Sequence, residues 1–384
     1  MFVSRIMLRN WRNFAKVDVM LRPRMFVVGA NASGKSNFLD VFRFLRDIAK
    51  AGGGLQFAIS ERGGLSLIRC LAARRYPDVE IAVELSDTPG GEPAWRYELG
   101  IKQHPRGDRK AYLSHEKVWR DGEQILNRPE DVDNADQLRL TQTHLEQINT
   151  NAEFRELTKF FEGVTYLHLV PQLVRYSREF SGPGPVGDPF GRSFLERIGR
   201  TPEKTRRNRL KQIEKALSLA VPQLKELTFL TDNNEGGKPH LEAIYDHWRP
   251  HGARQREREF SDGTLRLLGL LWSLLEGESM LLLEEPELSL NAGIVRQLAP
   301  MIYRLQRKRG RQVIATTHSA ELLDDHGIAP EEVLLFTPAK EGTQARLAAD
   351  TAEVKILLDE GMTIAESVLP ITVPAQATGL RSLE

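Results

Sequence analysis

Eight consecutive residues, Gly29 to Ser36, read Gly-Ala-Asn-Ala-Ser-Gly-Lys-Ser and fit the phosphate-binding loop (P-loop) pattern G-x-x-x-x-G-K-[ST]. An apolar run, 25–28, precedes them and a segment with helical spacing, 37–45, follows, so the loop is expected between a strand and the N-terminus of a helix. That arrangement points backbone N–H groups at phosphate oxygens. Lys35 is then expected beside β- and γ-phosphates, with the Ser36 hydroxyl on Mg²⁺.

A pair of acids could supply the second half of an ATP site. The apolar run 280–283 ends in Glu284 and Glu285, and a buried strand delivers such residues to the edge of an open α/β sheet where ligands bind. Glu284 is expected to hold Mg²⁺, directly or through water, and Glu285 to polarise the attacking water. The alternative is an ordinary strand that enters an acidic loop.

Two further patterns add phosphate contacts. His318 follows a predicted strand, 312–315, and is placed to reach a γ-phosphate; the less favoured alternative is a packed structural histidine. Ser261 and Gly263 precede an apolar helix, 265–275, and a serine hydroxyl, a glycine backbone and a helix N-terminus together make an anion-binding cap. Taken alone, Ser261 is simply a good N-cap.

Composition sets the outer limits. The 384 residues are 41% hydrophobic and 27% charged with a net charge of +1, which is ordinary for one to three globular domains. Basic residues crowd at 204–211, 254–258 and 304–311, as solvated faces or as nucleic-acid contacts. The single cysteine excludes an internal disulfide and a Cys-rich zinc site. No signal peptide and no long apolar run is seen, so a cytoplasmic protein without a membrane partner is expected.

The order of elements indicates an α/β fold. Two or three short strands are expected in residues 1–30, and an antiparallel meander at 79–85, 94–101 and 111–119. Helix and strand then alternate from 262 to 337, including one helix at 292–309, which is typical of a parallel sheet. The remaining predicted segments are helical stretches in 130–162, a strand at 166–170, a flexible loop at 181–191, a helix at 202–220 and strands at 224–231 and 240–247.

In their order, the P-loop, Ser-Asp-Gly, Glu-Glu-Pro-Glu and Thr-His-Ser resemble the ABC-type ATPases of the SMC, RecF and OLD group, and they bracket almost the whole chain. The run 283–290 resembles AAA-annotated prokaryotic members, many of which serve in anti-phage defence. The resemblance implies an α/β, ABC/SMC-like P-loop ATPase head with a mixed or parallel sheet, an antiparallel β meander and a helical insertion. The expected segments are 1–75 (N-terminal ATPase lobe), 76–222 (meander and helical insertion), 223–345 (C-terminal ATPase lobe) and 346–384 (helical tail with a disordered end).

The same resemblance implies that ATP is held between two copies of the chain. Residues 287–291 would cross the seam, Asn13 would lie near the base, and Gln172 would sense Mg²⁺. The nucleotide contacts implied are Gly29, Asn31, Ser33, Gly34, Lys35, Ser36, Asn37, Asn13, Ser261 and Gly263; the metal-binding residues are Ser36, Glu284 and Gln172; and the catalytic residues are Lys35, Glu285 and His318. The expected cofactors are ATP and Mg²⁺.

Several residues depart from that family pattern. Ala30 and Ala32 replace a common Pro and Gly, Glu284 replaces an Asp, and Asn291 stands where many relatives carry His. The zinc hook and the long coiled coil are absent, and an appended nuclease is not expected after residue 337.

The expected function is an ATP-hydrolysing switch, a homodimer or higher homo-oligomer, that controls a separately encoded effector, by analogy a nuclease, in anti-phage defence. The alternative is a DNA- or RNA-binding clamp or sensor ATPase in repair or recombination. A transporter subunit is disfavoured by the wide spacing between Lys35 and Glu284.

Overall fold

The computed structural model describes residues 1–73, 77–103, 110–177, 179, 188–232, 237–247 and 252–374. Most of the loop predicted at 181–191, and residues 375–384 of the chain end predicted to be disordered, lie outside these residues. The chain divides into two compact units. The first unit contains Met1–Thr165, Glu278–Leu282 and Gln306–Glu384, and the second contains Tyr166–Gly277 and Leu283–Leu305.

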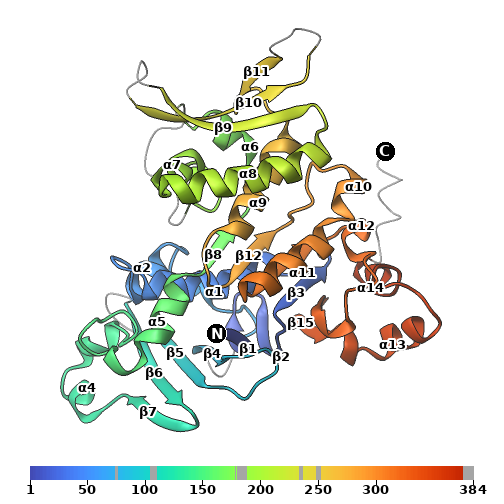
Figure 1. Ribbon diagram of the computed structural model, residues 1–384. Coiled ribbons are helices and arrows are strands. Elements are labelled where there is room, and N and C mark those ends of the chain that lie inside the picture. The colour runs from blue at the N-terminus through green and yellow to red at the C-terminus, as the bar shows by residue number, and fades with distance from the viewer. Residues whose placement is uncertain are drawn as a thin grey trace, which may run out of the picture. The chain divides into compact units, whose positions relative to one another are not determined.

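The first unit contains a six-stranded antiparallel sheet in the order β2-β1-β4-β5-β6-β7 (Figure 1). The strands are β1 (Phe2–Trp11), β2 (Phe14–Met20), β4 (Val79–Ser86), β5 (Trp95–Gln103), β6 (Ala111–Arg120) and β7 (Glu123–Arg128). The three predicted meander strands are confirmed as β4, β5 and β6, and their alternation follows the pleat, since Val79, Ile81 and Val83 are buried. Of the strands predicted before the P-loop, β1 pairs with the meander strand β4, and β2 pairs with β1 at the edge of the same sheet.

The second sheet has the order β15-β14-β3-β13-β12-β8. Its strands are β3 (Arg24–Gly29), β8 (Thr165–Leu167), β12 (Leu281–Glu284), β13 (Val313–Thr317), β14 (Val333–Ala339) and β15 (Gly342–Leu347). β13 and β14 run parallel to β3, whereas β15 forms an antiparallel hairpin with β14, so the sheet is mixed as expected. Every residue of β3 is buried, which explains why its sequence is a continuous apolar run rather than an alternating one.

The helices of the first unit are mostly short. They are α1 (Lys35–Ala49), α2 (Leu55–Ser60), α3 (Leu65–Ile68), α4 (Asp131–Ala135), α5 (Arg155–Glu162), α12 (Ala320–Leu323), α13 (Ala352–Asp359) and α14 (Ile364–Thr372).

The prediction of one helix over 292–309 is wrong, because the segment forms α10 (Ala292–Val295) and α11 (Leu298–Arg309). Pro300 has no N–H to donate, so it is tolerated in the first turn of α11 but would interrupt a continuous helix.

The second unit has its own small sheet, in the order β11-β10-β9. Its elements are α6 (Pro171–Arg175), α7 (Phe194–Arg200), α8 (Glu203–Ala220), β9 (Leu224–Asp232), β10 (Lys238–Tyr245), β11 (Ala253–Arg256), α9 (Asp262–Leu275) and α10. α8 contacts β9 and α9, and its buried side chains are Leu210, Ile213 and Leu217, which are spaced along one face of the helix (Figure 1). The predicted strand at 166–170 is too long, since β8 ends at Leu167 and His168 and Val170 instead bond to Pro189 and Phe190.

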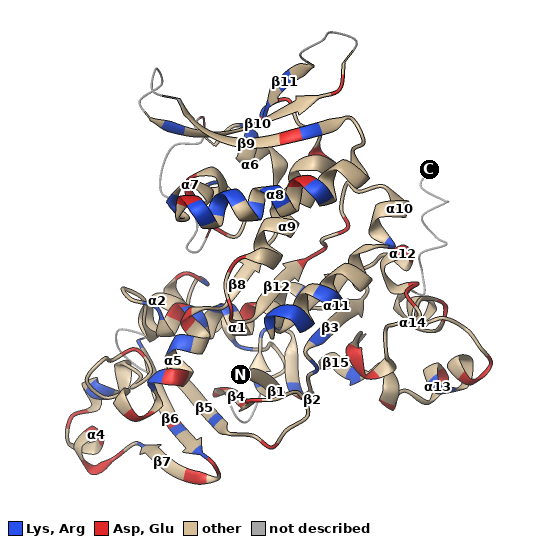
Figure 2. Cartoon of the chain, in the orientation of Figure 1, with Lys and Arg blue, Asp and Glu red and all other residues tan. Residues whose placement is uncertain are grey.

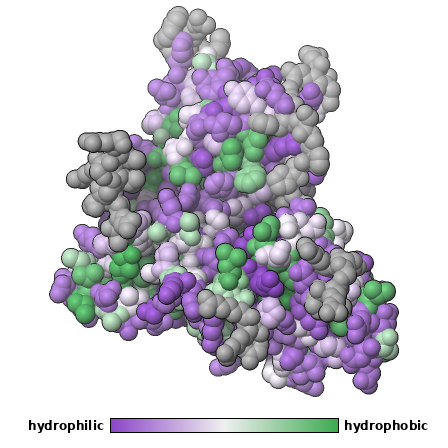
Figure 3. All heavy atoms as spheres, turned by 180° about the vertical axis from the view of Figure 1, so that it is seen from behind, coloured by the Kyte–Doolittle hydropathy of each residue, from purple (hydrophilic) through white to green (hydrophobic). Residues whose placement is uncertain are grey.

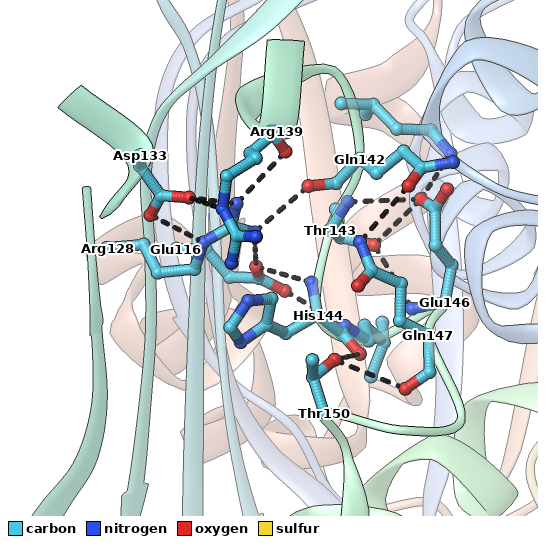
Figure 4. Close-up of polar contacts among 12 residues, drawn as sticks. Glu116, Arg128, Asp133, Arg139, Gln142, Thr143, His144, Glu146, Gln147 and Thr150 are labelled. Carbon is cyan, nitrogen blue, oxygen red and sulfur yellow. Dashed lines mark hydrogen bonds and ion pairs between the residues drawn. The ribbon is translucent and has the colours of Figure 1, made fainter. Parts of the chain in front are cut away.

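A buried ionic network fastens the helical insertion to the meander (Figure 4). Glu116 on β6 is fully buried, and its carboxylate accepts hydrogen bonds from Tyr97, Arg128 and the backbone N–H groups of His144 and Leu145. Arg128 also pairs with both oxygens of Asp133. Burial raises the pKa of the Glu116 carboxyl, and the hydrogen bonds from its partners oppose that shift. Because each charged group is paired, the network stabilises one conformation of the insertion.

Several apolar side chains of the described residues are exposed, and two of them, Leu67 and Leu71, line the same cavity. Leu67, Leu71, Ile148 and Leu219 are each more than half exposed, and the face in Figure 3 shows small green groups among hydrophilic residues. In the part of the chain that the structure describes, no helix has the length and apolar character needed to cross a bilayer.

Candidate functional site

The P-loop joins the buried strand β3 to the N-terminus of α1, which confirms the predicted strand, loop and helix. Gly34 caps α1 with φ of 97°, a left-handed conformation that favours glycine, and a Cβ there would collide with the Asn13 side chain. The loop and the first turn of α1 therefore contain all the residues predicted there, namely Gly29, Asn31, Ser33, Gly34, Lys35, Ser36 and Asn37. Asn31 and Ser36 are exposed at its surface, and Ser33 and Lys35 are buried.

Lys35 and Ser33 are the two residues that suit an anion. The Lys35 Nζ donates to the carbonyl oxygens of Gly29 (3.0 Å) and Ala30 (3.1 Å), so the loop folds around the ammonium group. The Ser33 Oγ is fully buried and has no hydrogen-bond partner among the residues that the structure describes. A buried hydroxyl without a partner is costly unless a ligand satisfies it. The loop therefore fits a group with several acceptor oxygens, as a nucleotide polyphosphate has.

A brace that the sequence did not reveal supports this loop. The Asn13 Nδ2 donates to the Ser33 carbonyl (2.9 Å) and to the Thr343 hydroxyl, and Thr343 itself donates to the Ser33 carbonyl (2.8 Å). Asn37 donates to the Asn13 Oδ1 (2.9 Å). The Asn13 amide thus ties the β1–β2 turn, β15 and α1 to the loop. Thr343 lies 310 residues from Ser33 in sequence, so no local pattern could have identified it.

A cavity of about 650 Å³ borders the loop in the first unit. Asn13 and Asn37 line it together with Arg12, Leu71 and Lys340. Leu71 is almost completely exposed, and the Arg12 guanidinium is held by Asp40 at 2.9 Å. Leu71 and Lys340 were not predicted from the sequence, because they belong to no motif.

His318 emerges at the same sheet edge as the P-loop. β13 runs parallel to β3 with Thr317 opposite Val28, so the residue after β13 lies beside the residue that begins the loop. The His318 side chain is exposed, and Ser319 after it caps α12. Among the described residues no cluster of three or more His, Cys, Asp or Glu side chains would hold a metal ion. A Mg²⁺ bound by one hydroxyl, one acid and phosphate oxygens needs no such cluster.

The remaining predicted residues lie in the second unit. Ser261 is the N-cap of α9, and its Oγ accepts from the Thr264 N–H at 3.1 Å, as the N-cap alternative predicted. Gly263 lies against the chain at Ser289, where a Cβ would come within 2.7 Å of the carbonyl oxygen. Gln172, predicted as a metal-sensing residue, donates to Asp262 (3.3 Å) and so lies beside Ser261 and Gly263.

The two adjacent acids differ in conformation. The Glu284 carboxylate accepts a hydrogen bond from the Tyr166 hydroxyl. Glu285 has a φ of 44° and Ser289 a φ of 61°, both left-handed and unusual for residues with a Cβ. The turn at Glu285 thus changes the direction of the chain directly after β12. Burial lowers the pKa of the Arg266 guanidinium, and the nearby Asp262 and Glu285 oppose the shift.

The predicted site residues form two groups. Asn13, the P-loop residues and His318 belong to the first unit, and Gln172, Ser261, Gly263, Glu284 and Glu285 belong to the second.

A P-loop on a buried parallel strand, within a mixed sheet and beside an antiparallel meander, defines an ABC/SMC-like P-loop ATPase. The fold is similar to a solved SMC head bound to the C-terminal winged-helix domain of ScpA, with a TM-score of 0.52 and 15% identity over 90% of this chain and 97% of that one. It is also similar to the Pyrococcus furiosus SMC head with an extended coiled coil, with a TM-score of 0.50 and 12% identity over 94% of this chain and all of that one. At such identities the likeness shows the fold alone.

The chain belongs to the AAA_21 family, described as an AAA domain, putative AbiEii toxin, type IV toxin–antitoxin system, which it matches over residues 24–324. No curated protein matches the sequence.

Proposed function

We propose that the protein binds and hydrolyses ATP and that nucleotide binding drives two copies together. One observation carries this proposal: the Lys35 ammonium group and the unpartnered Ser33 hydroxyl are buried within a P-loop whose backbone is braced by Asn13 and Thr343. A rigid loop that already holds its cation binds phosphate at a lower entropic cost than a loop that must first be ordered. Membership of a P-loop ATPase family supports the same ligand.

Each residue then has a defined part. Lys35 exchanges its carbonyl partners for β- and γ-phosphate oxygens, and the Ser36 hydroxyl and Glu284 hold the metal, directly or through water. The adjoining cavity with Arg12 and Leu71 holds the nucleoside. Glu285 orients the attacking water, and His318 donates toward the γ-phosphate. Bound Mg²⁺ supplies the charge that stabilises phosphoryl transfer.

The N-terminus of α9 supports assembly of two copies. Ser261 and Gly263 present a second helix N-terminus, which suits the γ-phosphate on the P-loop of another copy. Hydrolysis would remove that phosphate and release the dimer. We propose that this cycle controls a separately encoded effector, a nuclease by analogy, in anti-phage defence. The family description as a putative AbiEii toxin of a type IV system supports a role in such systems.

The test compares two variants with the unchanged protein. Lys35→Ala loses nucleotide binding, because the buried cation that meets the phosphates is gone. Glu285→Gln binds ATP and assembles but hydrolyses it at least about 100-fold more slowly, since the base that orients water is removed. Isothermal titration, sedimentation and phosphate release measure these properties. Unchanged turnover in Glu285→Gln removes Glu285 from its role, and ATP binding by Lys35→Ala contradicts the site.

A second candidate function, binding of a nucleic-acid backbone, is favoured by α8. Lys204, Arg207, Lys211 and Lys215 are exposed on the side opposite its buried residues and span about 16 Å of helix axis. Figure 2 shows that Lys and Arg recur along α8. Two other cations of α8 are used internally, since Arg206 stacks on Phe229 and Arg209 on Trp272. The exposed cations form a single positive stripe, which is complementary to a row of phosphates.

A further inference from the structure

The N-terminus of α9 carries a charge that opposes its proposed ligand. Ser261 and Gly263 flank Asp262, the first residue of the helix. A carboxylate in a first turn stabilises the helix dipole, but it repels a phosphate that approaches the same N–H groups. An anion site at this position therefore requires that the Asp262 charge be compensated.

The second unit provides that compensation from α6. The Arg175 Nη2 lies 2.6 Å from the Asp262 Oδ1, and the same nitrogen donates to the Phe260 carbonyl oxygen. The Gln172 Nε2 donates to the other carboxylate oxygen, Oδ2, at 3.3 Å. Both oxygens of Asp262 are thus engaged by one short helix, and Arg175 also fixes the backbone on the other side of Ser261.

The position of α6 is itself fixed by packing. Leu169, just before α6, lies against Gly269 of α9, where any Cβ would collide with its side chain. Arg175 is mostly buried, whereas Asp262 is more than a third exposed. A partly buried guanidinium has little freedom, so it holds the carboxylate in one orientation at a small cost in side-chain entropy. Arg266 is the other cation near Asp262, and it also acts on Glu285.

We propose that Arg175 is a positioning residue for assembly: it neutralises Asp262 and holds it aside, so that the Ser261 hydroxyl and the Gly263 N–H can donate hydrogen bonds to the phosphate of a nucleotide bound to a second copy. The inference rests on the proposed function, because it concerns the half of the site that only a partner's nucleotide reaches. It separates two steps. Nucleotide binding to the P-loop does not involve Arg175, whereas closure of the dimer does.

The experiment uses the full chain with Glu285→Gln as the parent, Mg²⁺ and ATP. Sedimentation measures the dimer dissociation constant, and a fluorescent ATP analogue at low protein concentration measures P-loop affinity. We expect Arg175→Ala to weaken dimerisation by about 10- to 100-fold, the loss typical of a hydrogen bond to a charged group, with P-loop affinity unchanged. Arg175→Lys, which keeps the charge, is expected to lose less.

The decisive variant is Arg175→Ala combined with Asp262→Asn. If the charge of Asp262 is what Arg175 offsets, removal of both charges restores dimerisation to within a few-fold of the parent. A double variant as weak as Arg175→Ala overturns the inference, because Arg175 would then only pin the Phe260 carbonyl. Assembly of Arg175→Ala equal to that of the parent overturns it as well.

The matched control is Arg197→Ala, which removes the ion pair with Glu276 (3.2 Å) just beyond the other end of α9. It is expected to leave dimerisation unchanged, and an equal loss there would mean that any weakening of α9 has this effect. If the parent itself never assembles with ATP, the proposed function fails and this inference fails with it. If the parent assembles and the Arg175 variants match it, only the inference fails.

Discussion

Ala32 shows how a single residue departs from what its position favours. It lies in the P-loop with φ of 61°, where a residue with a Cβ is strained by roughly 1–2 kcal/mol relative to glycine. Relatives recognised by resemblance commonly carry glycine here, and the alanine keeps the backbone without removing a phosphate ligand. The loop tolerates this strain because hydrogen bonds from Asn13 and Thr343 to the Ser33 carbonyl hold its backbone in place.

Replacement of this residue gives a clear prediction of stability. Ala32→Gly is expected to raise the free energy of unfolding by about 0.5–1 kcal/mol, because relief of strain outweighs the greater entropy of glycine in the unfolded chain. Ala30→Gly is the control. Ala30 does not have a left-handed backbone, so this change is expected to lower the free energy of unfolding by about 0.5–1 kcal/mol. Urea denaturation measures both variants. A loss of stability in Ala32→Gly similar to that in Ala30→Gly would show that the backbone at Ala32 is relaxed.

At the scale of elements, the cations of α8 fall into two groups: some pack against other parts of the protein, and others lie on the exposed side of the helix. One side of the helix packs on β9 and α9, and the exposed stripe faces away from it. α11 carries a comparable set, Arg307, Lys308 and Arg309, in its last turn. Cations in a last turn compensate the helix dipole, so those of α11 have a local purpose. In the α8 stripe, Arg207 pairs with Glu203 at 2.6 Å, whereas Lys204, Lys211 and Lys215 are exposed.

This difference predicts which helix contacts a polyanion. Replacing Lys204, Lys211 and Lys215 with glutamine is expected to weaken binding to duplex DNA. The slope of the logarithm of the binding constant against the logarithm of the salt concentration should fall by the equivalent of about two to three phosphate contacts. The same change at Arg307, Lys308 and Arg309 should leave both nearly unchanged. Fluorescence anisotropy between about 50 and 200 mM salt measures this. Binding that is absent or insensitive to salt in the unchanged protein would discard the second candidate function.

For the molecule as a whole, the proposed assembly concerns which copy of the chain supplies each part of the ATP site. In the proposed dimer the P-loop group of one copy meets the Ser261 group of the other. A complete site then requires two chains, and each chain contributes to two sites.

Mixing of two inactive variants tests this arrangement. Lys35→Ala lacks a working P-loop, and Ser261→Arg blocks the cap of α9, so neither should hydrolyse ATP alone. With random pairing, half of the dimers are mixed and each has one intact site, so an equal mixture should recover up to about one quarter of the normal rate. If ATP were enclosed by one chain, the mixture would stay inactive.

The sequence predicted those parts of the fold and site that depend on neighbouring residues. The P-loop, the cap at Ser261, the acids after an apolar strand and the alternation of β4 to β6 each involve a few consecutive positions, where local geometry and burial leave a readable pattern. The same local logic located helices α1, α8 and α9. It failed at Pro300, where the missing N–H outweighed an otherwise helical pattern.

The tertiary structure alone decided the contacts between distant residues. Thr343 braces Ser33 across 310 positions, Arg175 reaches Asp262 across 87, and β1 pairs with the meander strand β4 rather than with the P-loop strand β3. None of these pairs has a signature in a single sequence, because a contact between residues far apart in the chain imposes no pattern on the residues next to either of them. The sequence thus determined which groups could bind a phosphate, and only the folded chain determined what holds those groups in place.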